Sequence, residues 1–337
     1  MSHFNRSYNP FCVRAFLAVG WLLYISLGFG QNGCVPPPAG LTNWWPGEGN
    51  AKDIIGGYHG AISNGTTFAA GYVGQAFSFN GSNQYVTNSV PALKNIVNSY
   101  TMEFWAKPTA SRASTPESTT GTAGNTSQRY AIFPNNGKFG AAGAGVSVGT
   151  NGISVFEHAS AYLPALLVYE IPITNWVHVA VVYSNQQPRL YLNGGLVRTG
   201  LVSTHASCPS TCLGENGLGY GYYAGLLDEV SIYDRALSAA EILAVYAADS
   251  AGKCAPAIPP EILFQPTNQT VFAGGTATFN VNVASSQPVA YQWQFNGTNL
   301  LNNTASILAI TNVALVQAGD YRVIVTNIAG AVTSSVA

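Results

Sequence analysis

Few side chains in this 337-residue sequence could carry out acid–base or nucleophilic chemistry. Lys, Arg, Asp and Glu together make up 8 % of its residues, against roughly 25 % in an average soluble protein. One segment, Gly145–Gly149, matches the G-x-S-x-G nucleophile elbow of serine hydrolases. That elbow needs a strand, a turn and a helix, with Asp and His further along the chain, whereas Gly152–Phe156 has the pattern of another strand. The sequence therefore does not predict a serine nucleophile.

Paired carboxylates would be another source of catalysis. Two carboxyl groups about 5–5.5 Å apart are needed to cleave a glycosidic bond with retention. Glu103 is the only acid on its predicted strand, and Asp228 and Glu229 are neighbours, so their side chains are expected on opposite faces of a strand. His178 lies in an apolar strand and is expected in the core. We therefore predict that the protein is not an enzyme.

Two loops carry residues suited to binding a partner. Pro108–Gln128 is rich in Ser, Thr and Gly, and Thr204–Gly225 contains Tyr220, Tyr222 and Tyr223. Tyrosine rings combine an apolar face with a hydroxyl group, which suits contact with sugars or proteins. Alternatively, the tyrosines pack beneath their loop and the first loop is simply mobile. The three tyrosines are the candidate ligand-binding residues.

The N-terminus has the pattern of an export signal. Two arginines precede the apolar stretch Ala15–Gly30, which has small residues before Gln31. This arrangement predicts a signal peptide over residues 1–30 and a secreted protein. A membrane-spanning helix is one alternative, but the stretch is shorter than the about 20 residues that a span needs. A lipid anchor on Cys34 is another. We expect no membrane span once the signal is removed.

Four cysteines remain after the predicted cleavage. An even number in an oxidising compartment favours disulfides, and we predict the pairs Cys34–Cys254 and Cys208–Cys212. The first pair brackets a block of 220 residues, and the second closes a tight loop. A zinc site is disfavoured, because no second close pair of Cys or His accompanies the latter two.

Strand patterns dominate the chain that must position these residues. Apolar or alternating runs recur along residues 35–254, and Arg189–Val197 has the pattern of a hairpin with Asn and Gly at its turn. A capping box at Ser238–Glu241 predicts one helix near the end of this block. The Pro-rich stretch 255–260 is expected to be a linker to a smaller block, 261–337. We predict an all-β protein whose first domain is a two-sheet sandwich.

The first block resembles a known family. Three segments, Leu41–Ala51, Val73–Gly81 and above all Gly225–Ser238, resemble the laminin-G-like jelly-roll domains of the concanavalin A-like lectin/glucanase superfamily. The resemblance implies a jelly roll over residues 35–254. It also fits the first predicted disulfide, since the first and last strands of such a sandwich lie close together.

Relatives of this kind often hold a calcium ion, which carboxylate and carbonyl oxygens bind. Asp53, in the Gly-rich segment Lys52–Gly57, and Asp228 are the candidate ligands that the resemblance suggests. In the alternative, Asp53 caps a turn and Asp228 forms hydrogen bonds within the sandwich. Calcium is therefore the one cofactor that we consider.

The smaller block resembles an immunoglobulin-like domain. Trp293 is placed like the core tryptophan of strand C, and Tyr321 like the tyrosine corner of strand F. The block departs from the family because Val281 and Val323 stand where the inter-sheet disulfide is usual. It stops in the expected last strand, which predicts a truncated domain and a chain that is a fragment of a longer array.

Charge and fold together narrow the function classes. The formal net charge is −1, so the sequence offers no basic patch for nucleic acid. We predict a secreted, non-catalytic binding or adhesion protein whose partner is carbohydrate or an extracellular protein. A structural spacer is the main alternative, and a glycan-processing enzyme is the least favoured one.

Overall fold

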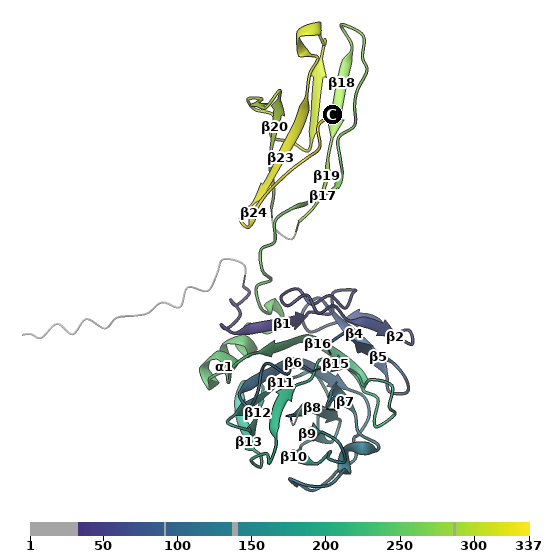
Figure 1. The fold of residues 1–337 in the computed structure, drawn as a ribbon, viewed down its shortest axis with the longest axis vertical. Helices are drawn as coiled ribbons and strands as arrows, with labels where there is room; N and C mark the ends of the chain where they lie inside the picture. Colours follow the sequence, from purple (N-terminus) through teal and green to yellow (C-terminus); the bar gives the residue numbers. More distant parts are fainter. Residues whose placement is uncertain (1–32, 91, 137–140, 286–287) are drawn as a thin grey trace, which may run out of the picture.

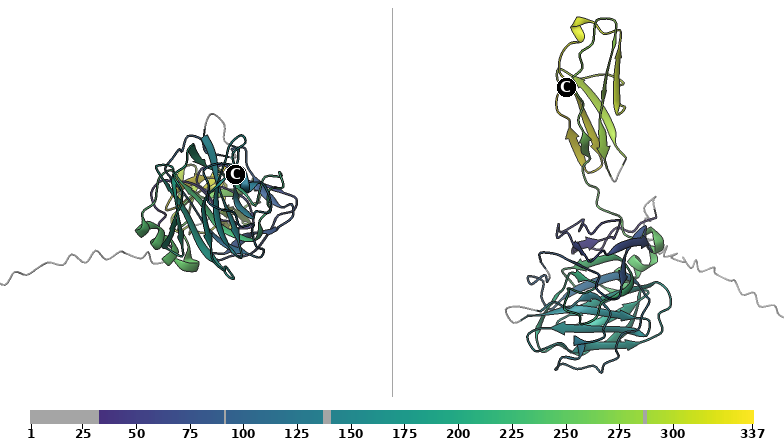
Figure 2. Two further views of the ribbon diagram at one scale, coloured as in Figure 1. Left: turned by 90° about the horizontal axis from the view of Figure 1, so that it is seen from below. Right: turned by 90° about the vertical axis from the view of Figure 1, so that its right-hand side faces the viewer.

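A computed structural model describes residues 33–90, 92–136, 141–285 and 288–337, so the predicted signal peptide, 1–30, lies outside the described residues. Within them, no helix is long and apolar enough to cross a membrane. The described chain forms two β-rich domains. Residues 255–260, which are neither helix nor strand, connect them (Figure 1). Figure 2 shows the same domains from two further sides.

The first domain is a sandwich of two eight-stranded sheets. The first sheet has the order β13-β12-β11-β6-β16-β4-β3, with β1 paired to β16. Its strands are β1 (Leu41–Trp45), β3 (Thr67–Ala70), β4 (Gln75–Asn80), β6 (Tyr100–Pro108), β11 (Val177–Ser184), β12 (Gln187–Leu192), β13 (Gly195–Thr199) and β16 (Ala224–Tyr233).

The second sheet has the order β10-β9-β8-β7-β15-β5-β2, with β14 paired in parallel to β8. Its strands are β2 (Ala61–Ser63), β5 (Tyr85–Thr87), β7 (Tyr130–Phe133), β8 (Ala141–Gly149), β9 (Gly152–His158), β10 (Ala165–Glu170), β14 (Ala206–Pro209) and β15 (Cys212–Leu213).

Alternate side chains of both sheets fill the space between them. Phe104 and Val181 of the first sheet and Val146 and Val155 of the second are fully buried in one core cluster. Such interdigitation of two inner faces is what holds a β-sandwich together. The predicted all-β, two-sheet architecture is confirmed.

One helix packs on the outer face of the first sheet. Helix α1 (Ala239–Ala247) starts at Ser238, whose side chain accepts a hydrogen bond from the backbone N–H of Glu241, so the predicted capping box is present. Ile242 is fully buried in a cluster with Tyr233 of β16. After the helix come the short 3₁₀ turn η2 (Asp249–Ala251) and Cys254, which forms the predicted disulfide with Cys34. The end of the domain is thereby tied to its beginning.

The second domain is a smaller sandwich with the predicted core. Trp293 is fully buried between the sheets, and the hydroxyl of Tyr321 donates to Gln317 O at 2.7 Å, as in a tyrosine corner. Val281 and Val323 are both buried in the same cluster, so apolar packing stands in place of the inter-sheet disulfide. Its elements are β17 (Glu261–Phe264), β18 (Thr276–Asn280), β19 (Asn282–Ala284), β20 (Ala290–Phe295), β21 (Thr298–Asn299), β22 (Ile307–Thr311), η3 (Leu315–Gln317), β23 (Tyr321–Asn327) and β24 (Gly330–Thr333).

Candidate functional site

Four ionisable side chains from distant parts of the sequence meet on the outer face of the first sheet. His178 Nε2 on β11 lies 2.9 Å from Glu103 Oε1 on β6. Lys253 Nζ lies 3.0 Å from Glu103 Oε2 and 3.1 Å from Glu229 Oε2. We call these four residues the ion cluster. Because Lys253 follows η2, the cluster fixes the last segment of the domain to the sheet.

Asp228 and Glu229 lie on the same face of the sheet, so the expectation from strand alternation is wrong. Glu229 has a φ of 59°, and the pairing of β16 with β6 shifts between Asp228 and Ser231. Such a β-bulge interrupts the alternation of side chains. Asp228 lies opposite Trp105 of β6, while Glu229 reaches the ion cluster through Lys253. The bulge thus gathers carboxylates that alternation would separate.

The ion cluster is closed to solvent, since each of its side chains is at most 3 % exposed. Burial acts to raise the pKa of Glu103, but Lys253 and His178 outweigh it and lower that pKa. Burial acts to lower the pKa of Lys253, but Glu103 and Glu229 outweigh it and raise that pKa. Glu103 and Lys253 are therefore paired ions at neutral pH. His178 is buried, as predicted, but it lies in the ion cluster on the outer face and not in the core between the sheets.

The two candidate calcium ligands already have other partners. The carboxylate of Asp53 accepts five hydrogen bonds, from the side-chain amide of Asn43 and the backbone N–H groups of Trp44, Ile55, Gly56 and Tyr58. A carboxylate has about four lone-pair sites, so this one is saturated and organises its turn. Asp228 Oδ2 accepts two backbone N–H groups at 2.8 Å, and burial raises its pKa to about 8. In the described ranges no cluster of His, Cys, Asp and Glu could hold a metal. The five hydrogen bonds leave the carboxylate of Asp53 no spare lone pair for a calcium ion.

The loop between β15 and β16 carries the candidate tyrosines and is fixed by a buried carboxylate. Glu215 is fully buried, and it accepts the backbone N–H of Tyr220 at 2.8 Å and that of Asn216 at 2.9 Å. The carbonyl of Tyr220 in turn accepts the backbone N–H of Gln128 at 3.2 Å. The backbones approach so closely that a Cβ on Gly221 would lie 2.1 Å from Gln128 O. The loop is therefore held from within and from β7.

Two of the three tyrosines are partly exposed and one is not. Tyr223 is fully buried and its hydroxyl donates to a backbone carbonyl at 3.2 Å, so its prediction as a ligand-binding residue is wrong. Tyr222 is half-buried and stacks on Tyr85 with ring centroids 6.4 Å apart. Tyr220 is half-buried, and the centroid of its ring lies 6.1 Å from the centroid of the His158 ring. We call Tyr220, Tyr222, Tyr85 and His158 the tyrosine rim.

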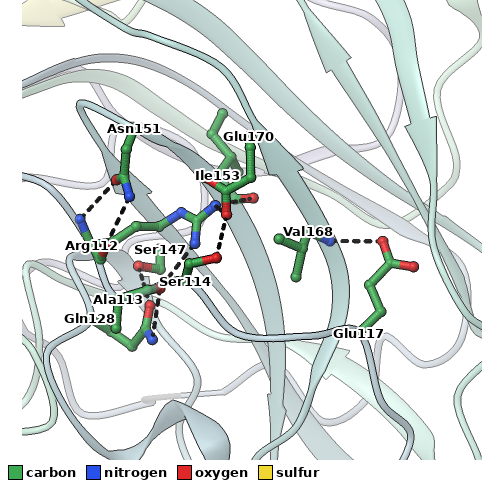
Figure 3. Close-up of polar contacts among 10 residues, drawn as sticks. All are labelled: Arg112, Ala113, Ser114, Glu117, Gln128, Ser147, Asn151, Ile153, Val168 and Glu170. Carbon is green, nitrogen blue, oxygen red and sulfur yellow. Dashed lines mark hydrogen bonds and ion pairs between the residues drawn. The ribbon is translucent and has the colours of Figure 1, made fainter.

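The other candidate loop, Pro108–Gln128, is attached to the second sheet by polar contacts (Figure 3). Arg112 Nη2 lies 3.1 Å from Glu170 Oε1, just after the start of the loop. Gln128 Oε1 at its end accepts the hydroxyl of Ser147 on β8 at 3.0 Å. Between them the loop covers ring edges of β7 and β9, since Gly124 packs against the side chains of Tyr130 and Phe156. The loop therefore covers rings of β7 and β9, and its last residue, Gln128, contacts the backbone of Tyr220 in the tyrosine rim.

Cys208 and Cys212 are free thiols, so the second predicted disulfide is wrong. Cys208 lies on β14 and packs with Ala141, whereas Cys212 lies on β15 and packs with Phe133 in another cluster. Because β14 pairs with β8 and β15 with β7, the change of strand partner sends the two sulfurs into different parts of the sandwich.

Two organising residues are missing from the sequence-based candidates. Lys253 directly precedes a predicted disulfide cysteine, and a charge at such a site in a chain with so few charges could have drawn attention to it. Glu215 lies in a loop of glycines and polar residues, and no spacing pattern distinguishes it from an exposed acid. Both act through buried contacts, which alternation patterns do not report.

Comparison with known families agrees with the fold. Residues 80–243 match the family model of the concanavalin A-like lectin/glucanases superfamily, and residues 259–327 match that of the immunoglobulin domain. These two matches, in this order along the chain, confirm the two resemblances that the sequence predicts. A search of curated proteins found no match.

The solved structures to which parts of the chain are similar differ widely in kind. Domain 4 of AbnA, a GH43 extracellular arabinanase from Geobacillus stearothermophilus in complex with arabinotriose, is 21 % identical, with 60 % of this chain and 96 % of that chain covered and a TM-score of 0.44. Trypanosoma rangeli sialidase is 15 % identical, with 62 % of this chain and 33 % of the sialidase chain covered and a TM-score of 0.44. Titin M4 is 27 % identical, with 23 % of this chain and 92 % of the titin chain covered and a TM-score of 0.22.

Proposed function

We propose that this is a secreted, non-catalytic binding protein whose first domain recognises carbohydrate at the tyrosine rim. The observation that carries the proposal is the pair of half-buried rings, Tyr220 and Tyr222, on a loop that the buried Glu215 holds in place. A contact surface that is already ordered loses little conformational freedom on binding. Tyrosine also has few rotatable bonds for the contact area that it supplies.

Carbohydrate suits this surface better than an apolar ligand. The C–H face of a sugar ring packs on an aromatic ring, and its hydroxyls need polar partners. In the same loop as Tyr220, the side-chain amide of Asn216 donates to Asn135 Oδ1 at 3.1 Å. The pKa of His158 is lowered by burial, and its Nδ1 lies 2.8 Å from Pro134 O. A neutral imidazole with that bond presents Nε2 as an acceptor.

The absence of catalysis in this proposal rests on where the acids lie. Glu103 and Glu229 are buried and paired with Lys253, so neither meets a substrate. General acid–base catalysis needs its groups within hydrogen-bond reach of the reacting atoms. The proposal of secretion rests on the Cys34–Cys254 disulfide, because such bonds persist in oxidising compartments. We propose binding without calcium, given the saturated carboxylate of Asp53.

The test is a glycan array probed with the full chain, once with calcium and once with a chelator. We expect binding under both conditions. For the glycan that binds, Tyr222→Ala should weaken the affinity about tenfold, equivalent to about 1.4 kcal/mol. The matched control is Tyr58→Ala, since Tyr58 is 38 % exposed and lies in the turn of Asp53.

Three outcomes would contradict the proposal. If no glycan binds under either condition, the spacer role is favoured. Equal losses in the Tyr222 and Tyr58 variants would place the site elsewhere. Release of reducing sugar from a bound glycan would show catalysis.

A further inference from the structure

Arg129 lies against the loop that carries the tyrosine rim. It directly precedes β7, and Tyr130 N donates to Gly221 O at 3.1 Å, so its backbone runs beside that of the loop. The backbone of Arg129 is also held by β8, because its N–H donates to Ser147 Oγ at 2.9 Å. The side chain reaches the rim, where Nη1 donates to Tyr222 O at 3.3 Å. A guanidinium group is therefore fixed at the edge of the tyrosine rim.

Most of the hydrogen-bonding capacity of this guanidinium is unused. Arginine has five N–H donors. The bonds that Arg129 forms within the described residues are the one to Tyr222 O and one from Nη1 to Gln128 O at 3.4 Å. Nε is enclosed without a partner, whereas Nη2 has no partner among those residues and is not enclosed by them. Because Arg129 is half-buried, Nη2 can donate to a group that arrives from solvent.

Arg129 differs from three other arginines of the first domain in having no counterion. Arg112, Arg198 and Arg235 each pair with a glutamate. In the part of the chain that the structure describes, no carboxylate forms an ion pair with Arg129. Its positive charge is therefore available to a ligand.

The surroundings of Arg129 supply no exposed negative charge. The segments that carry the tyrosine rim and Arg129 contain one acid, Glu215, in residues 80–87, 123–130, 158–162 and 213–223. Glu215 is fully buried, and both of its carboxylate oxygens accept backbone N–H groups. His158 adds no positive charge at neutral pH, because burial lowers its pKa. The rim thus offers one cation and exposes no carboxylate of its own, which complements an anionic ligand.

We propose that the glycan bound at the tyrosine rim is acidic and that Arg129 binds the carboxylate of a uronic acid. The inference rests on the proposed function of the rim. A sugar ring packs on Tyr222, and its carboxylate accepts hydrogen bonds from Nη2 of Arg129. Such charge-assisted bonds are about twice as strong as neutral ones, and the planar guanidinium matches the planar carboxylate. The hydroxyl of a neutral sugar also accepts from Nη2, but it leaves the charge without a counterion.

The test is a glycan array that carries uronate oligosaccharides beside their carboxyl-reduced counterparts, in which –COO⁻ is replaced by –CH₂OH. Sulfated glycans are included. The full chain is applied at about 50 mM and about 500 mM NaCl. At low salt we expect uronates to bind about tenfold more tightly than the reduced glycans, since a hydrogen bond to a charged group contributes about 1.5–3 kcal/mol. This preference should shrink at high salt, because salt screens an exposed pair of charges.

Variants assign the preference to one side chain. Arg129→Gln removes the charge and keeps an amide that can donate to Tyr222 O. It should weaken binding of the uronate about tenfold and leave that of the reduced glycan within about twofold, which also shows that the variant is folded. Arg129→Lys keeps the charge and should keep part of the preference. Arg189→Gln is the matched control and should change neither affinity, because Arg189 is also half-buried and outside the ion pairs but lies on β12 of the first sheet.

The inference and the proposed function fail in different ways. Equal binding of uronates and reduced glycans would overturn the role of Arg129, as would binding of neutral or sulfated glycans without any uronate. So would a preference that survives Arg129→Gln, or an equal loss of both kinds of glycan in that variant. Each of these results leaves carbohydrate binding by the protein in place. If no glycan on the array binds, the proposed function itself is contradicted together with this inference.

Discussion

The ion cluster and the tyrosine rim are both organised by a buried glutamate. The ion cluster is closed to solvent, whereas the two tyrosines on the loop of Glu215 are partly exposed. Glu103 is neutralised by the side chains of His178 and Lys253. Glu215 is instead held by backbone N–H groups of its own loop, among them that of Tyr220. The first arrangement closes a segment onto a sheet, and the second displays aromatic rings. Only 8 % of the residues in this chain are charged. In both regions the buried charged side chains hold a backbone segment in place, and uncharged tyrosine rings form the proposed contact surface.

The largest effect should follow from breaking the ion cluster. Glu103→Gln leaves Lys253 buried with one remaining carboxylate, and removing one partner of a buried pair typically costs about 3–5 kcal/mol. We expect the free energy of unfolding of the first domain to fall by that amount. Urea denaturation of the full chain, followed by far-UV circular dichroism, measures it.

The control for this variant removes the cation as well. In Glu103→Gln with Lys253→Met, Glu229 keeps its side chain, and burial already raises the pKa of that side chain. Glu229 can therefore take up a proton instead of remaining as a buried ion. Most of the lost stability should return in the double variant. A single variant that costs under about 1 kcal/mol would show that the cluster is not what holds the segment.

The disulfide fixes the same segment by a covalent route. Replacing Cys34 and Cys254 with serine opens a loop of 220 residues and should cost about 2–4 kcal/mol. Because Lys253 is adjacent to Cys254, the two restraints are coupled. Glu103→Gln should therefore cost less in the serine background than in the native one. Strictly additive losses would show that cluster and disulfide act independently.

Much of this fold was predictable, and the reasons are local. Apolar alternation, the capping box at Ser238, and the buried Trp293 each depend on a few neighbouring residues or on a recognisable pattern. The ion cluster depends on the bulge at Glu229 and on Lys253, which lies 150 residues from Glu103. Contacts at that separation, and a single left-handed residue, leave no periodic trace. The wrong prediction of a Cys208–Cys212 disulfide shows that a short spacing in the sequence can also mislead. The two cysteines lie on different strands, β14 and β15, and the spacing does not reveal this.

A buried acid without a cation should give the opposite pH dependence to Glu103. Glu157 points between the sheets, and burial, only partly offset by Ser203 and Tyr183, raises its pKa from 4.5 to about 7. Its contribution is fully present below about pH 4.5 and is lost as the pH rises toward about 7, by at most about 3 kcal/mol. Glu103, with its lowered pKa, contributes above its unfolded pKa and loses that contribution in acid.

Glu157→Gln should therefore flatten the decline in stability between about pH 4.5 and 7. Denaturation midpoints across that range provide the measurement. Asp228→Asn is the matched comparison, since burial raises the pKa of Asp228 as well, to about 8. Its removal should flatten a window that extends to higher pH. An unchanged slope in the Glu157 variant would mean that this carboxyl is not the source of the decline.

The smallest effect on stability, and the most direct one on the rim, is expected from Gly221→Ala. The added Cβ would lie 2.1 Å from Gln128 O, so the loop must move away from Gln128, at a cost of about 1–3 kcal/mol. That movement displaces Tyr220 and Tyr222 together, and affinity for the bound glycan should fall at least as far as in Tyr222→Ala. Gly195→Ala is the control, because a Cβ there has its nearest contact at 3.7 Å. Glycan titration and denaturation of both variants measure the affinity and the stability separately. If Gly221→Ala lowers stability but not affinity, the tyrosine rim does not need a fixed loop to bind. The proposed contrast between the rim and the ion cluster would then be wrong.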